Sequence, residues 1–555
     1  MRWFEGSQPA MPSGDRPARS REDRRCPGRS QDLLGFLAIS ALVLGVTGVA
    51  QASAPPPPPT DAVHGHYVVL GSAGDETVAY ARVVIDAGYE CPTVVGGADP
   101  LAMSTRDNPH GFPVIVCEAQ ISQGASLAIQ LADGRMPLPT VDPDPKRVLF
   151  FGDTGCKLPK AGHTGGCAWG TPAEPFATLA SAAASGPPPD LLLHAGDYNY
   201  RATGGQILLT QGEVADRKQV AEWPYDAGDG VGPDEGCLQG SDATFYSQNA
   251  PNSNSPDRWE AWRDDFFTAA ADLLPKAPWI FARGNHELCS RAGPGFLYFL
   301  DPSSNLGDGQ VSCPEPDTSK PPIDNVVLGQ PYGVSLGDLT VLVTDSANAC
   351  DFFSNSTFAS RYEEEFAALD ALAPSEGTAW LLSHRPLWGV SEYDPSETSG
   401  CTSVNTYSCL NVEMQKALSS TPLGALPATV DLVLAGHMHR FQSLTFDGDR
   451  PPVVIVGTSG VALAGDQPVG SFSATVDGLA TTGVATGPTV TTPSGIQDAF
   501  AYLDVQRSQG SDWSGVLHNP AAGLTLADCG SDQAAKGSVC QLAPGVEAVK
   551  PSAEQ

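Results

Sequence analysis

Five short patches of this chain place oxygen- or nitrogen-bearing side chains at the end of an apolar run. The runs are mostly apolar and short, which is typical of buried strands, and they cover residues 148–151, 191–195, 279–282, 380–383 and 432–435. The side chains that follow are Asp153, Asp197 with Tyr200, Asn285 with His286, His384, and His437 with His439. In open α/β sheets, ligands gather beyond the carboxyl ends of the strands. The pattern therefore predicts an α/β fold in which the five patches meet in one crevice.

A glycine stands immediately before a donor in four of these patches, at Gly152, Gly196, Gly284 and Gly436. Because glycine has no Cβ, it allows the backbone to turn sharply. We expect each glycine to turn the donor that follows it into the shared crevice.

The donors are carboxylate, amide, phenol and imidazole groups, and none is a thiol. Such groups suit iron, manganese and zinc ions, whereas a structural zinc site usually recruits cysteine. The number of donors predicts a site for two metal ions.

The order of the motifs, GD, GDxxY, GNHE, a single histidine and GHxH, resembles that of the calcineurin-like metallophosphoesterases, and among them the purple acid phosphatases. Most members of this superfamily have a histidine two residues after the first aspartate, where this chain has Gly155. The acid phosphatases replace that ligand with a tyrosine three residues after the second aspartate, where this chain has Tyr200. The loss of one ligand and the gain of the other coincide, although Tyr200 could also simply pack in its aromatic turn.

The resemblance implies two sets of metal ligands that share Asp197. The first metal would be bound by Asp153, Asp197, Tyr200 and His439, and the second by Asp197, Asn285, His384 and His437. A phenolate is a hard donor, so the implied ions are Fe(III) at the first site and Fe(II), Zn(II) or Mn(II) at the second. His286 is implied to face the substrate and to stabilise or protonate the leaving oxygen. Asp197 and His286 are thus the expected catalytic residues.

The implied reaction is the hydrolysis of phosphate monoesters by a metal-activated hydroxide, as in an acid phosphatase. Two alternatives stay open, namely a phosphodiesterase or nucleotidase of the same superfamily and a catalytically silent relative that binds a partner through its loops. The complete set of donors argues against silence.

Several other residues could contribute to the pocket. Asn285 is expected to contact the substrate as well as a metal. Arg385 could hold a phosphate oxygen through its planar guanidinium group, or it could anchor a surface loop. Trp388, Glu392 and Tyr393 are further candidates to line the pocket. His194 lies inside a strand run and is expected to make a buried hydrogen bond rather than to bind metal.

The resemblance also implies a four-layer α/β/β/α sandwich preceded by a small all-β domain. The β domain is expected at residues 63–140, the catalytic domain at 147–543 and a tail at 544–555. Periodicity predicts helices over residues 174–184, 258–274 and 361–372, with Asp257 as an N-cap candidate for the second. Strands at residues 453–456, 499–505 and 523–526 are expected to complete the second sheet, and residues 465–494 to be irregular.

The first 52 residues are expected to be a signal peptide. They combine an arginine-bearing start, an apolar stretch at residues 33–49 and the small residues Ala50 and Ala52 near the end. A transmembrane anchor is the alternative, but the stretch is short for a span. Residues 53–62 form a proline-rich linker. We therefore expect a secreted or periplasmic protein with no stable membrane insertion after cleavage.

Cysteine usage favours export. The chain has 13 cysteines, and Cys26 lies in the leader, so an even number is left to form disulfides. Sequence neighbours suggest pairs 91–117, 156–167, 289–313, 401–409 and 529–540, which leaves Cys237 with Cys350.

Charge limits the partners. The formal net charge is −32 at pH 7, and no basic patch of the kind that follows a nucleic-acid backbone is present. We expect no nucleic-acid partner and a small phosphate ester as substrate, drawn by the metal centre rather than by the overall field. Residues 203–257 form a polar insertion that is expected to be a loop near the pocket.

Overall fold

All five apolar runs that precede the predicted donors are strands in the computed structural model of the chain. They are β9 (Arg147–Phe151), β10 (Leu191–His194), β11 (Trp279–Phe281), β14 (Thr378–Leu382) and β17 (Val430–Ala435). Strands β9, β10 and β11 are parallel neighbours in one sheet, and β14 and β17 are parallel neighbours in another. Because parallel strands end at the same edge of a sheet, the donors of each group leave their sheet together.

The structure describes residues 55–74, 76–156, 171–200, 257–289, 291–303, 311–314, 326–351, 354, 356–392, 407–464, 469–508, 510–534 and 537–549. All of them belong to one unit, Ala54–Gln555. The predicted signal peptide, most of the insertion at residues 203–257 and Tyr393 lie outside the described residues.

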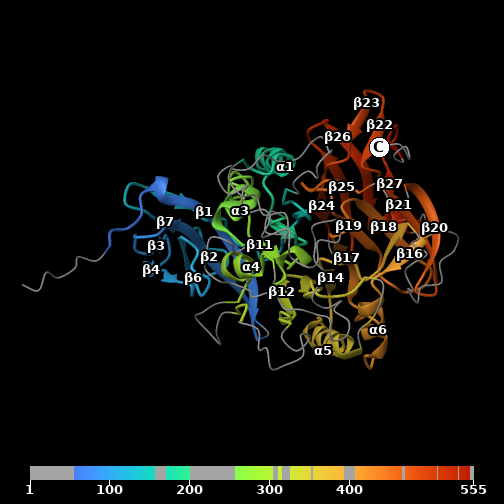
Figure 1. Ribbon diagram of the computed structural model, residues 1–555, viewed down its shortest axis with the longest axis horizontal. Coiled ribbons are helices and arrows are strands. Elements are labelled where there is room, and N and C mark those ends of the chain that lie inside the picture. The colour runs from blue at the N-terminus through green and yellow to red at the C-terminus, as the bar shows by residue number, and fades with distance from the viewer. Residues whose placement is uncertain are drawn as a thin grey trace, which may run out of the picture. The chain divides into compact units, whose positions relative to one another are not determined.

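The larger sheet has eleven strands within the described residues, in the order β27-β26-β25-β24-β9-β10-β11-β1-β2-β6-β5 (Figure 1). Its other members are β27 (Cys540–Leu542), β26 (Leu524–Gly530), β25 (Trp513–Asn519), β24 (Tyr502–Arg507), β1 (Val63–Ala73), β2 (Glu76–Asp86), β6 (Val114–Ile121) and β5 (Ser104–Thr105). The run β9, β10, β11 and β1 is parallel, and the flanking pairs are antiparallel.

The second sheet has eight described strands in the order β12-β13-β14-β17-β19-β18-β21-β20. Its other members are β12 (Tyr332–Leu336), β13 (Leu339–Val343), β19 (Val453–Val456), β18 (Phe441–Phe446), β21 (Leu479–Ala485) and β20 (Gly470–Val476). Strands β13, β14, β17 and β19 are parallel, so this sheet is also mixed. The predicted α/β class is therefore confirmed.

Three small sheets and a few helices complete the described part. The sheets are β15 (Gly389–Glu392) with β16 (Tyr407–Leu410); β23 (Gly495–Asp498), β22 (Thr489–Thr492) and β28 (Glu547–Val549); and β4 (Leu101–Ala102), β3 (Thr93–Val95), β7 (Ala128–Gln130) and β8 (Arg135–Pro137). The helical elements are η1 (Thr60–Ala62), α1 (Glu174–Ser185), α3 (Trp259–Trp262), η5 (Arg263–Phe267), η6 (Asn285–Glu287), α4 (Gly293–Phe299), α5 (Ser356–Leu372), α6 (Val412–Ser420) and α7 (Ser531–Ala534).

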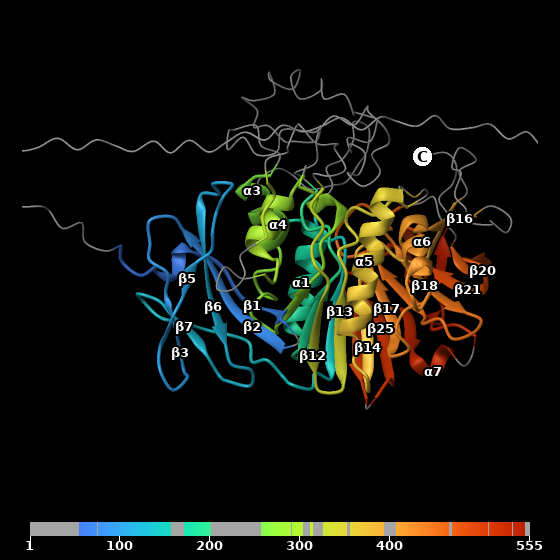
Figure 2. The same ribbon diagram turned by 90° about the horizontal axis from the view of Figure 1, so that it is seen from below.

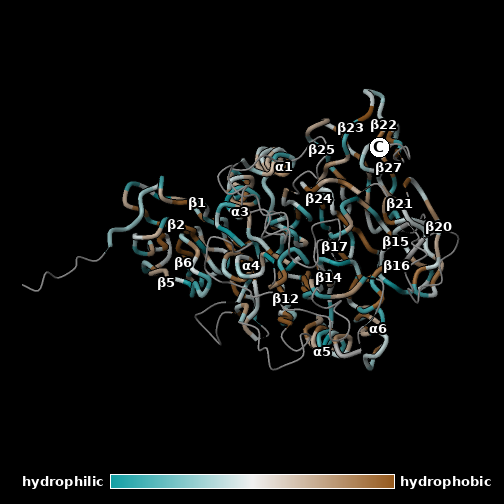
Figure 3. The backbone as a smooth tube through the Cα atoms, viewed as in Figure 1, coloured by the Kyte–Doolittle hydropathy of each residue, from teal (hydrophilic) through white to brown (hydrophobic). Residues whose placement is uncertain are grey.

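The buried side chains divide into three clusters that follow the alternation of the strands. Phe150 and Leu193 of the large sheet share one cluster with Trp380 and Leu434 of the second sheet. The opposite side chains of the large sheet pack with α1, α3 and α4, and those of the second sheet pack with α5 and α6 (Figure 2). Figure 3 shows hydrophobic residues along the strands that supply these clusters. The alternation is what a strand buried on both faces requires.

Two predictions about the C-terminal part are wrong. Residues 465–494 were expected to be irregular, but strands β20, β21 and β22 lie there. The segments predicted at residues 499–505 and 523–526 are strands β24 and β26, yet they extend the large sheet rather than the second one. Periodicity reveals a strand but carries no information about which sheet it joins.

Two predicted helices are confirmed as α1 and α5. The third, at residues 258–274, has α-helical geometry only over α3 and continues as the π-helical element η5. Asp257 does not cap it, because its carboxylate instead accepts hydrogen bonds from Trp262 Nε1 at 2.6 Å and from the Gly295 backbone at 2.5 Å.

The segment at residues 63–140 is rich in strands, as predicted, but four of them belong to the large sheet. The boundary predicted near residue 140 therefore does not coincide with a boundary between sheets. Buried Arg82 and Arg106 share the carboxylate of Glu118, each at 2.7 Å. The same arginines donate to backbone carbonyls at the end of α4, including that of Phe299 at 2.9 Å and that of Tyr298 at 3.1 Å. These bonds tie the segment to the helix that follows the GNHE motif.

Three predicted disulfides are present, Cys91–Cys117, Cys289–Cys313 and Cys529–Cys540. Cys156 and Cys350 are also disulfide-bonded. Their predicted partners, Cys167 and Cys237, and Cys401 of the last predicted pair lie outside the described residues. Among the described helices, none has the length and apolar character needed to cross a membrane.

Candidate metal centre

The backbone takes an unusual conformation at four of the predicted donors. Asp153, Asp197, His437 and His439 have φ angles of 58°, 61°, 74° and 50°, and Asp477 is the other described residue besides glycine with a positive φ. This left-handed region costs free energy for residues that carry a Cβ, and such strain gathers at functional sites. The surrounding structure thus holds these four turns in place.

The expectation about the preceding glycines is confirmed only at Gly196, whose φ is +96°. The other three have no positive φ and serve a different purpose. A Cβ on Gly284 would collide with Asp197, one on Gly436 with the carboxylate of Asp153, and one on Gly152 with the carbonyl of Val456. These glycines let neighbouring turns approach closely, while the donors themselves make the sharp turns.

Three predicted donors meet around the hydroxyl of a fourth, Tyr200. This oxygen lies 3.0 Å from Asp153 Oδ1, 2.9 Å from Asp197 Oδ2 and 3.0 Å from His439 Nε2. Asp153, Asp197 and His439 bring their donor atoms within 4.8 Å of one another, a spacing that suits a metal ion. The structure therefore brings the whole predicted first ligand set together.

The other predicted donors meet on the second side of Asp197. His384 Nε2 lies 2.8 Å from Asn285 Oδ1 and 3.3 Å from Asp197 Oδ1. His437 Nδ1 lies 3.0 Å from the same Asn285 oxygen. Asp197, His384 and His437 form a second group of donor atoms within 4.8 Å. The two oxygens of Asp197 face the two groups, as a bridging ligand requires.

The chemistry of this donor set fits two cations. Asp153 and Asp197 are buried and converge on one phenol oxygen. Burial and the charge of Asp197 raise the pKa of Asp153 to about 7, although His384 opposes the rise. Two buried carboxylates this close repel each other unless positive charge lies between them. His384 supplies some in the absence of metal. Burial lowers its pKa, but the charge and hydrogen bond of Asp197 and the charge of Asp153 together outweigh burial and raise the pKa to about 9.

Glu287, the last residue of the GNHE motif, shapes the turn that carries Asp197. Its buried carboxylate accepts hydrogen bonds from the backbone of Asp197 at 2.9 Å, Tyr198 at 2.9 Å, Asn199 at 3.2 Å and Gly284 at 3.1 Å. Burial, followed by the charge of Asp197, raises the pKa of Glu287 to about 8. No role was predicted for Glu287 from the sequence, although it belongs to the GNHE motif.

His286 lies beside the centre rather than in either donor group. Its backbone N–H donates to Asp197 Oδ1 at 2.9 Å, and its ring lies 4.1 Å from that of Tyr200, centroid to centroid. The side chain belongs to the short η6 turn, next to the donor Asn285. This position is compatible with the role expected for it.

Arg385 is buried next to the second donor group. Its Nη1 lies 2.5 Å from Asp351 Oδ2 and 3.0 Å from His437 Nε2, and only 1% of the residue is exposed. Its guanidinium thus lies between Asp351 and the donor His437.

No role at the site was predicted for Asp351 from the sequence. Its Oδ2 also lies 2.9 Å from His437 Nε2, and its pKa is lowered because Arg385 and His437 outweigh the effect of burial. A signal was present, since the apolar strand β13 is followed by Asp345 and Asp351 much as the other five runs are followed by donors.

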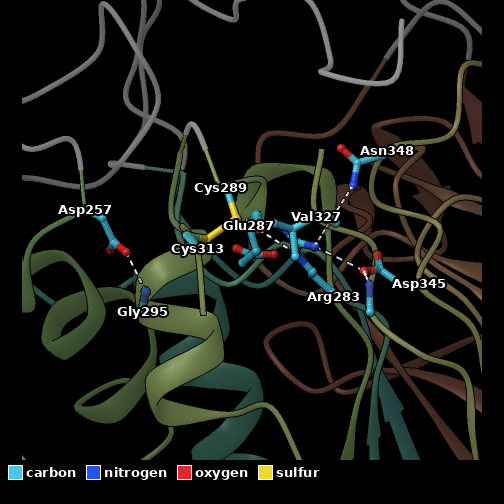
Figure 4. The surroundings of a disulfide bond; sticks show 10 residues. Asp257, Arg283, Glu287, Cys289, Gly295, Cys313, Val327, Asp345 and Asn348 are labelled. Atoms are coloured by element: carbon cyan, nitrogen blue, oxygen red, sulfur yellow. Dashed lines mark hydrogen bonds and ion pairs between the residues drawn. A yellow bond between two sulfur atoms is a disulfide. The ribbon is translucent and has the colours of Figure 1, made fainter. Parts of the chain in front are cut away.

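Hydrogen bonds of Arg283 and a disulfide stabilise the turn that carries the GNHE motif (Figure 4). Arg283 donates from Nε to the carbonyl of Glu287 at 2.7 Å, and from Nη1 to the carbonyl of Val327 at 2.9 Å and to Asp345 Oδ2 at 3.1 Å. Two residues after Glu287, Cys289 is bonded to Cys313. The predicted disulfide of Cys289 therefore closes the segment that directly follows the motif.

Two remaining expectations concern residues near the centre. His194 is fully buried, bonds Thr154 Oγ1 through Nε2 at 2.8 Å and accepts from the Gly196 backbone at 3.1 Å, so the predicted hydrogen-bonding role is confirmed. Trp388 was a candidate to line the pocket, but it is 2% exposed and packs against Phe446 beneath the guanidinium of Arg450. It is a core residue.

Gly155 lies against the turn that carries Tyr198 and Tyr200. Most members of the superfamily that the sequence resembles have a histidine at this position. A Cβ at this position would lie 2.6 Å from the carbonyl oxygen of Tyr198 and 2.8 Å from Cδ2 of Tyr200. The chain therefore has no room for a side chain at residue 155 while Tyr200 points into the centre.

The chain matches a known protein family and is similar to solved structures. A family model described as calcineurin-like phosphoesterase matches residues 146–441. No curated protein matches the chain. Among solved structures, the purple acid phosphatase PPD1 from yellow lupin (Lupinus luteus) seeds has a TM-score of 0.46 and 13% identity, with 83% of this chain and 72% of that chain covered. The structure of PhoD has a TM-score of 0.40 and 11% identity, with coverage of 88% and 92%.

Proposed function

Since the chain belongs to the calcineurin-like phosphoesterase family, we propose that it is a secreted or periplasmic enzyme that hydrolyses small phosphate monoesters at a centre of two metal ions. The proposed first ion is Fe(III), and the second is Fe(II), Zn(II) or Mn(II). The four-layer α/β/β/α order of sheets and helices is part of the same proposal.

One observation carries this proposal. Two groups of donors share the carboxylate of Asp197, with Tyr200 on one side of it at 2.9 Å and His384 on the other at 3.3 Å. Such a bridge suits two ions that act on one substrate. A binding relative without activity would have no need to keep both groups complete.

The residues can be assigned to steps of the reaction. Two bound cations would lower the pKa of a shared water and offset the charge of the phosphate. The two oxygens of Asp197 each face one donor group, which fixes the position of the two groups relative to each other. Tyr200 places a phenol oxygen between Asp153 and His439. His286 projects beside the ring of Tyr200 and donates a proton to the leaving oxygen as the ester bond breaks.

Asn285 is proposed to contact the substrate through its amide nitrogen, a hydrogen-bond donor, because its amide oxygen faces the second donor group. Arg385 is also proposed to contact the phosphate. Its Nη1 is engaged by Asp351 at 2.5 Å, and a guanidinium carries further N–H donors. Its positive charge still lies next to the second donor group and favours an anionic substrate.

Export is supported by the cysteines. Three disulfides close loops of the described chain, including one directly behind the GNHE motif. Disulfides persist in oxidising compartments and are rare in the cytosol.

The proposal is tested by metal analysis, a visible absorption spectrum and a substrate panel on the purified protein. We expect two metals per chain, a band from charge transfer between a tyrosinate and Fe(III), and faster hydrolysis of p-nitrophenyl phosphate than of bis-p-nitrophenyl phosphate. Preference for the diester would favour the phosphodiesterase alternative. A colourless zinc enzyme would contradict the role of Tyr200, and a fully loaded protein without turnover would contradict the enzyme.

A further inference from the structure

The ring of His437 is held at both nitrogens by different parts of the chain. Nδ1 lies 3.0 Å from Asn285 Oδ1, on the side of the second donor group. Nε2 lies 2.9 Å from Asp351 Oδ2 and 3.0 Å from Arg385 Nη1. A neutral imidazole carries one hydrogen and one lone pair on its two nitrogens, so whichever group bonds Nε2 decides what Nδ1 offers to a metal.

The two neighbours of Nε2 favour opposite tautomers of the ring. An ionised carboxylate only accepts hydrogen bonds, so Asp351 favours a hydrogen on Nε2 and leaves the lone pair on Nδ1. A guanidinium only donates, so Arg385 favours a lone pair on Nε2 and a hydrogen on Nδ1. Only the first state leaves Nδ1 able to bind a metal.

The geometry favours Asp351 in this competition. Its Oδ2 accepts from Arg385 Nη1 at 2.5 Å, a shorter contact than the one between Arg385 and His437. The other oxygen, Oδ1, accepts from Asn411 Nδ2 at 3.1 Å, and Asp351 O accepts from the Val412 backbone at 2.8 Å. Asp351 is therefore held firmly at the start of α6, and one of the two hydrogens of Arg385 Nη1 is directed to it rather than to the imidazole.

We propose that Asp351 is a positioning residue that keeps the hydrogen of His437 on Nε2, so that the Nδ1 lone pair faces the second metal. This inference rests on the proposed function, because it assumes that the second donor group binds a cation. Carboxylates that hold the outer nitrogen of a metal-binding histidine commonly contribute a factor of about 10–100 to metal affinity.

Substitutions of Asp351 and Arg385 test which of the two residues determines the position of the His437 hydrogen. In Asp351→Ala, Arg385 is released and donates to Nε2, which moves the hydrogen to Nδ1 and blocks the second site. In the double variant Asp351→Ala with Arg385→Ala, that donor is gone and Nδ1 is free to bind metal again. A residue that merely stabilised the fold would not be rescued by a second deletion.

The experiment uses the full-length protein and measures Zn(II) affinity at each site by competition with a chromophoric chelator, together with metal content. We expect Asp351→Ala to keep the first metal and to lose affinity for the second by about 10–100-fold. The double variant should recover most of that loss. Asp528→Ala, which removes an exposed aspartate from β26, is the matched control and should behave as the wild type.

Wild-type affinity of the second site in Asp351→Ala would overturn the inference, as would an equal loss in the double variant. If Asp351→Ala does not fold, as judged by circular dichroism, Asp351→Asn carries the test, because adding Arg385→Ala to it should raise the affinity of the second site. A lower affinity there would count against the inference. Failure of the wild type to bind a second metal and to hydrolyse any ester would instead contradict the proposed function.

Discussion

The ring of Tyr200 fills the space that a side chain at Gly155 would need. A Cβ on Gly155 would lie 2.8 Å from Cδ2 of Tyr200, closer than such atoms approach in proteins. The hydroxyl of the same ring reaches Asp153, Asp197 and His439. The missing histidine and the added tyrosine therefore have one steric cause: a side chain at residue 155 and the ring of Tyr200 would occupy the same space.

Gly155→Ala tests this relationship. Because the nearest obstacles include the backbone carbonyl of Tyr198, the turn must shift, and we expect the free energy of unfolding to fall by about 1–3 kcal/mol. Denaturant unfolding measures this loss, and metal analysis should show weaker binding at the first site. Gly97→Ala is the control, since its Cβ would meet its nearest neighbour at 3.7 Å. Equal stability of the two variants would contradict the steric reading.

Tyr200→Phe removes one oxygen and keeps the ring. We expect loss of the visible absorption band and weaker binding of the first metal, with the second site less affected, because the phenol oxygen lies within the first group only. Absorption spectra and metal content measure both effects. Tyr198→Phe removes a neighbouring hydroxyl that bonds the carbonyl of Ala282 at 2.8 Å, and it should keep the band. A band that survives in Tyr200→Phe would exclude this tyrosine as the chromophore.

Asp197→Ala and His286→Ala should differ in kind. Asp197 faces both donor groups, so its removal should empty both sites and abolish activity. His286 belongs to neither group of donor atoms, so His286→Ala should keep both metals and lower kcat by about 10²-fold or more. Metal content and steady-state kinetics separate the two results. An empty centre in His286→Ala would assign this histidine to the ligands instead.

Glu287→Gln should disturb the turn that carries Asp197. Each carboxylate oxygen accepts from two backbone N–H groups, and a carboxyl group has lone pairs on both oxygens whether charged or neutral. The amide nitrogen of glutamine has none, so two buried donors lose their acceptor, at a cost of about 2 kcal/mol or more. Denaturant unfolding should show this loss, while the exposed Glu174→Gln should show almost none. Unchanged stability and metal content in Glu287→Gln would show that the four bonds are dispensable.

Metal loading should weaken as the pH falls. Without metal, the charge of Asp197 raises the pKa of His384 to about 9 despite burial, and burial raises that of Asp153 to about 7. Below each pKa the group holds a proton that a metal must displace, so apparent affinity should drop by about tenfold per pH unit between 9 and 7 and more steeply below 7. Zn(II) titrations of metal-free protein at pH 6, 7 and 8 measure the slope. Affinity that does not change with pH would contradict these titrations.

Much of the fold followed from local patterns. The strands β9, β10, β11, β14 and β17 were predicted from short apolar runs, because a strand buried on both faces must be apolar throughout. The assignment of β24 to the large sheet could not be predicted, since it depends on pairing with residues more than 300 positions away, as between Leu503 and Phe150. Strand β26 joins the same sheet through its neighbour β25.

By itself, the sequence determined which donor groups this protein has and which strand each of them follows. Side-chain chemistry and the hydrophobic pattern of a strand are both local properties. It also carried the paired change at Gly155 and Tyr200. Only the tertiary structure decided what holds the donors in place: the four backbone bonds of Glu287 and the competition of Asp351 and Arg385 for His437. Those contacts join turns from different strands, and the free energy of a buried charge depends on partners that come close only when the chain is folded.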